Sequence, residues 1–164
     1  MQFELCIFTR QKKTFTPNIF VSDVFSYLAI HVVIPERTLM KQKFELEYSL
    51  NTTPGVLFSR LSSASGLSEW FADNVNIDGN TYTFFWEGSD QQAEMIQIKE
   101  NKSIRFRWVN DEDPKAYFEF RIDQDELTGD SYLTITDFTE DGEKIDAVDL
   151  WDSQVSELKH VLGL

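Results

Sequence analysis

The end of the sequence carries the pattern that most restricts how this chain can fold. Apolar side chains recur there at steps of three, four, three and four residues, at Val148, Trp151, Val155, Leu158 and Leu162. This spacing places them on one face of an α-helix. Aspartates near its start and Lys159 and His160 near its end complement the helix dipole. The stripe has to be buried, so the rest of the chain must supply a large apolar surface.

Short segments in which apolar and polar residues alternate supply that surface. Phe44, Leu46, Tyr48 and Leu50 begin the pattern, and six further segments follow, near residues 75–77, 82–86, 96–98, 104–108, 116–122 and 133–135. Alternation with period two is typical of β-strands with one buried face. Tight-turn residues separate the segments, beginning with Asp78-Gly79-Asn80 and Gly88-Ser89-Asp90. Strands joined this way, without helices between them, form an antiparallel meander.

Two short helices are expected between the first strand and the meander. Thr53 suits a helix N-cap and Pro54 suits the first helical position, and Ser65 restarts a helical turn that leads to Trp70 and Phe71. The sequence therefore predicts an α+β fold over residues 40–164. A curved antiparallel sheet of about six to seven strands is expected, with two short helices after strand 1 and the long C-terminal helix packed on the sheet.

Residues 1–39 differ in composition from the remainder. They carry a net charge of +1, whereas residues 40–164 carry −14. Residues 18–34 are rich in apolar side chains but contain Asp23 and His31, and a spanning helix needs about 20 apolar residues. Our interpretation is that translation begins at Met40 and that residues 1–39 are a non-native or disordered extension. An ordered accessory segment and a membrane anchor are the alternatives.

Four segments together resemble the START-like, helix-grip superfamily: SASGLSEWFADNV, TFFWEG, SIRFRWV and LWDSQVSELKHVL. This superfamily includes the birch-pollen-allergen proteins and the heat-shock chaperone ATPase-activator-like domains, and the chain is most similar to small bacterial START-like domains. The resemblance covers residues 41–164. It implies a space between the long helix and the sheet, which many relatives use for lipids, sterols, polyketides or hormones.

The resemblance and the inward register of the strands nominate ten residues to line that space. They are Trp70, Phe71, Phe84, Trp86, Phe106, Trp108, Phe118, Phe120, Trp151 and Val155. Aromatic stripes are often simply core. The alternative is therefore that these side chains fill the space and leave no pocket.

Catalytic chemistry has few candidates in this sequence. A cysteine nucleophile could only be Cys6, in the extension, and a base for a serine triad could only be His31 or His160. His160 is interpreted as a surface residue that compensates the helix dipole. Asp137 continues the inward register of Leu133 and Ile135 and is a candidate pocket acid, since burial would raise its pKa. The sequence predicts no metal site and no cofactor.

The net charge of −13 argues against nucleic acid and anionic membrane surfaces as partners. The expected partner is an apolar small molecule or a protein with a basic surface. A single cysteine fits a cytoplasmic protein.

Three functions follow, in order of preference. The first is a non-enzymatic binding domain that holds an apolar small molecule between the sheet and the C-terminal helix. The second is a protein-interaction module, like the chaperone activators, with a filled core. The third is an enzyme that uses a pocket carboxylate such as Asp137 on a polyketide-like or aromatic substrate.

Overall fold

The structure is a computed structural model that describes residues 41–125, 127 and 129–164. The interpretation of residues 1–39, with both of its alternatives, lies outside the described residues. Ten elements make up the described part of the chain, in the order β1 (Gln42–Leu50), α1 (Pro54–Ser62), α2 (Ala64–Leu67), β2 (Asn74–Asp78), β3 (Thr81–Trp86), β4 (Ser89–Lys99), β5 (Ser103–Trp108), β6 (Phe118–Gln124), β7 (Ser131–Thr139) and α3 (Lys144–Leu162).

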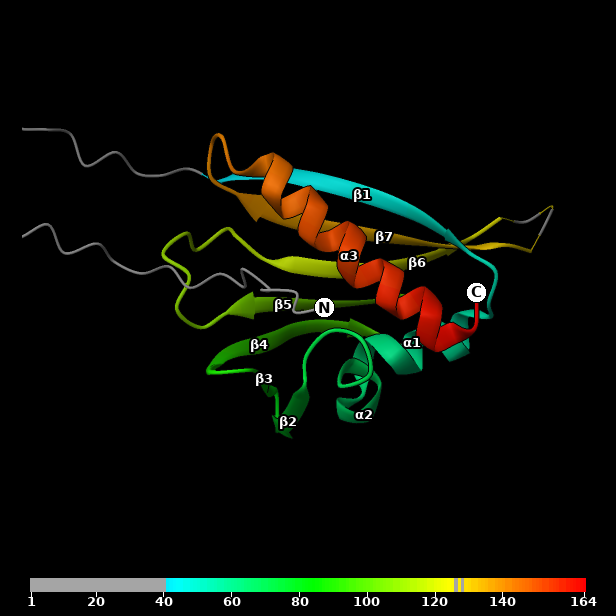
Figure 1. Ribbon diagram of the computed structural model, residues 1–164, viewed down its shortest axis with the longest axis horizontal. Coiled ribbons are helices and arrows are strands. Elements are labelled where there is room, and N and C mark those ends of the chain that lie inside the picture. The colour runs from blue at the N-terminus through cyan, green and yellow to red at the C-terminus, as the bar shows by residue number, and fades with distance from the viewer. Residues whose placement is uncertain (1–40, 126, 128) are drawn as a thin grey trace, which may run out of the picture. The chain divides into compact units, whose positions relative to one another are not determined.

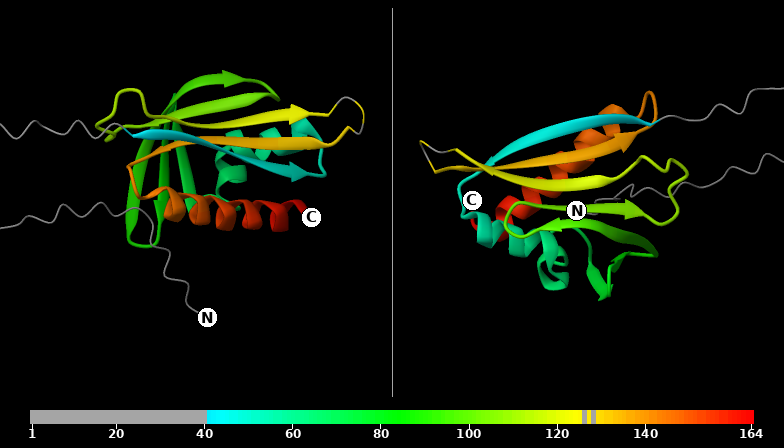
Figure 2. Two further views of the ribbon diagram at one scale, coloured as in Figure 1. Left: turned by 90° about the horizontal axis from the view of Figure 1, so that it is seen from above. Right: turned by 180° about the vertical axis from the view of Figure 1, so that it is seen from behind.

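The seven strands of these residues form one antiparallel sheet in the order β1-β7-β6-β5-β4-β3-β2. The first strand pairs with the last, and the remaining neighbours are consecutive in the sequence. The sheet curves, and α3 crosses its concave side (Figures 1 and 2). This arrangement confirms the predicted α+β helix-grip fold, with seven strands and a long C-terminal helix on the sheet.

Local sequence explains the start of α1. The side-chain oxygen of Thr53 accepts a hydrogen bond from the backbone N–H of Val56, and Pro54 occupies the first turn. The N-cap hydroxyl satisfies one of the backbone donors that a helix start leaves unpaired, and the fixed φ of proline suits the first helical position. The predicted helix start is therefore found where the sequence placed it.

The turn between β3 and β4 is shorter than expected from the sequence. Ser89 and Asp90 are not part of the break, because they already pair with Trp86 and Phe85 in the sheet. Gly88 adopts a left-handed backbone with φ of 81°, which glycine accommodates without steric cost. Since Glu87 and Gly88 alone form the turn, the two residues after them begin β4.

The C-terminal helix buries the predicted stripe. Trp151, Val155 and Leu158 are buried, and Val148 and Leu162 pack against the core while partly exposed. Gly163 ends the helix with φ of 74°, and its backbone N–H donates to carbonyl oxygens of the last turn. Left-handed glycine after the last turn is a common way to end a helix.

Candidate functional site

The direction of the strands brings chemically distinct residues to one end of the sheet. Neighbouring strands are antiparallel, so β3, β5 and β7 run the same way and finish at the same end. Trp86 is the last residue of β3, Trp108 is the last of β5, and Asp137 lies near the end of β7. Helix α3 begins at this end (Figure 1). We call it the tryptophan end and define it by Trp86, Trp108, Trp151 and Asp137.

The nine predicted aromatic residues form a single cluster of ring contacts on the concave side. Phe71 lies at its centre, and its ring centroid is 5.0 Å from that of Phe84. The ring of Trp151 stacks on Phe71 at 5.9 Å, with an angle of 14° between the ring planes. Further contacts connect Trp70, Trp86, Phe106, Trp108, Phe118 and Phe120 to the same cluster. Val155, the tenth predicted residue, is buried on α3.

Burial is uneven across this cluster. Phe84, Phe106, Phe118 and Phe120 are fully enclosed, whereas Trp86 and Trp108 are partly exposed. The four phenylalanines therefore form core, as the filled-space alternative expects. Within this cluster, the aromatic surface that remains accessible to an incoming molecule lies mainly on Trp86 and Trp108.

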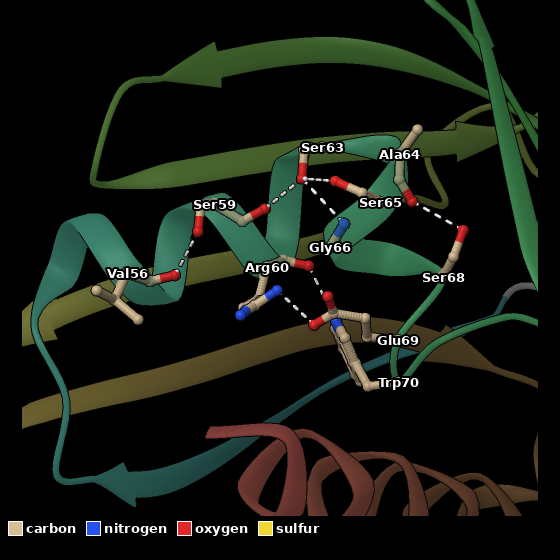
Figure 3. Close-up of polar contacts among 10 residues, drawn as sticks. All are labelled: Val56, Ser59, Arg60, Ser63, Ala64, Ser65, Gly66, Ser68, Glu69 and Trp70. Atoms are coloured by element: carbon tan, nitrogen blue, oxygen red, sulfur yellow. Dashed lines mark hydrogen bonds and ion pairs between the residues drawn. The ribbon is translucent and has the colours of Figure 1, made fainter. Parts of the chain in front are cut away.

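The junction of α1 and α2 holds Trp70 and Phe71 in place. The hydroxyl of Ser63 donates to the carbonyl of Ser59 and accepts from the backbone N–H of Gly66, as Figure 3 shows. A Cβ on Gly66 would lie 2.3 Å from that same carbonyl oxygen, so the helices can approach this closely only at a glycine. The indole N–H of Trp70 donates to the Arg60 carbonyl at 3.0 Å. The junction thus directs the following residues into the sheet.

Asp137 lies on the concave side, in contact with α3. It pairs in register with Phe44, which is buried in the core. One carboxylate oxygen accepts from the indole N–H of Trp151 at 2.9 Å, and the other accepts from the backbone N–H of Phe138 at 2.7 Å. Burial raises the pKa of Asp137 to about 6, and the two hydrogen bonds offset only part of this effect. The predicted inward register therefore places a perturbed acid beside the aromatic cluster.

An ion pair lies close to Asp137. Lys41, just before β1, contacts Asp111 in the β5–β6 connection. The Asp111 side chain is only 5% exposed and that of Lys41 is 15% exposed. Lys41 lowers the pKa of Asp137 and Asp111 raises it, both by charge. Sequence reasoning missed this pair, because 70 positions separate its members and neither lies within a strand.

Two aromatic residues outside the predicted set belong to the same side of the sheet. Tyr82 contacts Phe106 at 4.9 Å and donates its hydroxyl proton to the Ser62 carbonyl. Phe44 is buried beside Asp137. The alternating sequence pattern predicts that both side chains point to the concave side, since Phe44 is in phase with Leu46 on β1 and Tyr82 is in phase with Phe84 on β3.

Within the described part of the chain, few residues could bind a metal ion or act as a histidine base. Residues 41–125, 127 and 129–164 contain no cluster of three or more His, Cys, Asp or Glu side chains able to hold a metal ion. His160 is exposed on the last turn of α3, as predicted. The other chemistry candidates, Cys6 and His31, lie outside the described residues. In the same described residues, no helix is long and apolar enough to cross a bilayer.

Comparison with known proteins decides the family. The sequence profile of the START-like superfamily domain matches residues 38–164. The chain belongs to the START-like superfamily. No curated protein matches the sequence of this START-like chain. The solution structure of BfR322 from Bacteroides fragilis is 44% identical, with a TM-score of 0.57, over 76% of this chain and 93% of that protein. These matches confirm the resemblance found in the sequence.

More distant structures share the fold of this START-like domain. The Aha1 dimer from Colwellia psychrerythraea is 15% identical, with a TM-score of 0.61, over 72% of this chain and 93% of that one. DynU16, a protein in the dynemicin biosynthetic locus, is 14% identical, with a TM-score of 0.62, over 74% of this chain and 47% of that one. At these identities the likeness shows the fold alone, and the START-like fold is compatible with ligand binding.

Proposed function

We propose that this START-like domain is a non-enzymatic binding domain that holds an apolar small molecule between the sheet and α3, at the tryptophan end. The observation that carries the proposal is the partial exposure of Trp86 and Trp108 on a cluster that is otherwise enclosed. Indole rings contribute large apolar contact areas. A ligand would cover the exposed parts of Trp86 and Trp108.

The enclosed phenylalanines limit how such a molecule would bind. They already contact one another, as the 5.0 Å separation of Phe106 and Phe118 illustrates. A ligand would therefore rest against the tryptophan end, and it would reach further only if α3 moved away from the sheet. We further propose that the protein acts in the cytoplasm, because a chain with a single cysteine cannot form an internal disulfide and suits a reducing compartment.

Native mass spectrometry of the full chain, purified gently from its source, tests the proposal. The expected result is a reproducible extra mass that is lost on denaturation. Trp108→Leu should reduce this extra mass. Phe85→Leu is the matched control, because Phe85 is a partly exposed aromatic residue on the opposite face of β3 from Trp86. A bare protein mass, or equal loss in both variants, would contradict the proposal.

A protein-interaction module is the second candidate, and exposed apolar residues at the same end favour it. Val109 directly follows β5 and is 55% exposed, and Ile145 in the first turn of α3 is 75% exposed. Exposed acidic residues lie near both in the sequence, at Glu112, Asp141 and Glu143. Such a surface suits a partner with basic and apolar groups, and charge speeds docking. A captured partner whose binding weakens as salt is raised would support this alternative.

The third candidate, an enzyme using Asp137, receives less support from the contacts. Both carboxylate oxygens already accept hydrogen bonds. Of the described residues only His160 is a histidine, and it lies at the opposite end of α3, so Asp137 would have to act on a polyketide-like or aromatic substrate without a histidine beside it. Turnover that disappears in Asp137→Asn would be the observation in its favour.

A further inference from the structure

Asp137 has unused capacity to accept hydrogen bonds. An ionised carboxylate offers about four acceptor positions, and the contacts of Asp137 are one indole N–H and one backbone N–H. Its neighbour in register is the apolar Phe44. No ion pair formed by residues 41–125, 127 and 129–164 includes it. When ionised, this carboxylate therefore has no direct cationic partner in the described part of the chain.

The negative charge of ionised Asp137 is not neutralised by the charged groups around it. The charged groups that act on Asp137 are Lys41 and Asp111, and these two already pair with each other. The three together leave one negative charge when Asp137 is ionised. Asp137 is partly enclosed, and holding a charge in such a site without a counter-ion is costly, which agrees with the direction of its pKa shift. A bound cation would relieve this cost.

Aromatic side chains lie near the same carboxylate, and Trp151 directs the N–H edge of its ring toward it. Trp151 contacts it directly, and Trp151 stacks on Phe71, which in turn contacts Trp86. On the sheet, Glu119 pairs with Thr136, so the next residue pair along these strands is Phe118 beside Asp137. Phe118 stacks with Trp108 at 4.7 Å. Cations are attracted to the faces of aromatic rings, most strongly to tryptophan.

We propose that the ligand of the tryptophan end is an organic cation, a protonated amine on an apolar or aromatic body, with its nitrogen beside Asp137 and its body against Trp86 and Trp108. This inference rests on the proposed binding function and specifies the class of ligand. The same charge disfavours a fatty acid or another anionic amphiphile. The ammonium would fill the open acceptor positions of the carboxylate, and the tryptophans would bury the body.

Three probes of the same shape and different charge test the proposal. They are 2-naphthylmethylamine, 2-naphthalenemethanol and the carboxylate 2-naphthaleneacetate, titrated into the ¹⁵N-labelled full chain at pH 7.5 and followed by NMR. The amine should bind at least about ten-fold more tightly than the acetate, equivalent to about 1.4 kcal/mol. The shifted resonances should include the indole N–H groups of Trp86, Trp108 and Trp151.

Asp137→Asn removes the charge and retains an oxygen that can accept from Trp151. It should weaken binding of the amine about ten-fold and leave the neutral alcohol unchanged. Asp141→Asn is the matched control, since it removes the same charge from an exposed turn of the β7–α3 connection. It should leave the preference for the amine intact.

The outcomes separate the two proposals. If all three probes bind equally, or if Asp137→Asn leaves the preference for the amine unchanged, the inference about the cation is wrong and the binding function stands. If Asp141→Asn abolishes the preference as Asp137→Asn does, net charge causes it and Asp137 is not the contact. If none of the probes binds at millimolar concentration, the proposed binding function fails as well.

Discussion

The carboxyl group of Asp137 should make the stability of this domain depend on pH in a defined direction. Burial raises its pKa from 3.8 to about 6 in the folded protein. The folded state therefore holds this proton more tightly than the unfolded chain does. The contribution of Asp137 to the free energy of unfolding is largest below pH 3.8, falls as the pH rises to about 6, and stays constant above that.

The size of this effect follows from the shift. One pKa unit corresponds to about 1.4 kcal/mol, so the shift of Asp137 from 3.8 to about 6 sets an upper limit of about 3 kcal/mol. Asp137→Asn does not titrate. The free energy of unfolding of this variant minus that of the wild type should increase by up to about 3 kcal/mol between pH 3.5 and pH 7.5. Other carboxylates titrate in both proteins and cancel in the difference.

Urea unfolding at half-unit steps of pH, followed by tryptophan fluorescence, measures this difference. The substitution also changes the contact with the Phe138 N–H, but this adds an offset that varies little with pH, so the shape of the curve is the test. NMR of the Trp151 indole N–H should report the same titration directly, since it donates to Asp137. Asp141→Asn controls for net charge. A difference that stays flat across this range, or declines toward pH 7.5, would refute the reasoning.

Three further substitutions test the packing that positions the site, each measured by urea unfolding. Gly66→Ala should cost about 1–3 kcal/mol, because its Cβ would overlap a backbone carbonyl of α1. Gly55→Ala, whose Cβ would have its nearest contact at 3.7 Å, should leave stability unchanged or raise it by up to about 1 kcal/mol, and equal effects of the two substitutions would contradict the tight junction. Phe120→Ala should cost about 3–5 kcal/mol, since its fully buried ring leaves a cavity, and a cost under about 1 kcal/mol would mean that the cluster is loosely packed. Tyr82→Phe should cost about 1 kcal/mol through loss of its hydroxyl contact with the end of α1, and no change would show that the contact is not formed in solution.

The local pattern of the sequence was enough to predict the elements and the faces that they bury. Alternation indicated the inward side of most strands, because successive side chains on a strand point to opposite faces. On β4, however, Ile96 and Ile98 are exposed and Ala93 is buried, and a register shift between Met95 and Gln97 interrupts the alternation. The stripe through Trp151 and Val155 decided which side of the C-terminal helix meets the sheet. These two periodicities suffice to place Asp137 on the concave side.

Distances across the sheet and exposure at its end were decided only by the tertiary structure. The pair of Lys41 and Asp111 joins segments 70 residues apart, and no local periodicity records such a pairing. Trp86 and Phe84 share one pattern on β3, yet only Trp86 is partly exposed, because it ends the strand. Sequence spacing determines the direction of a side chain, whereas the packing of distant segments determines whether it is covered and what charges lie beside it.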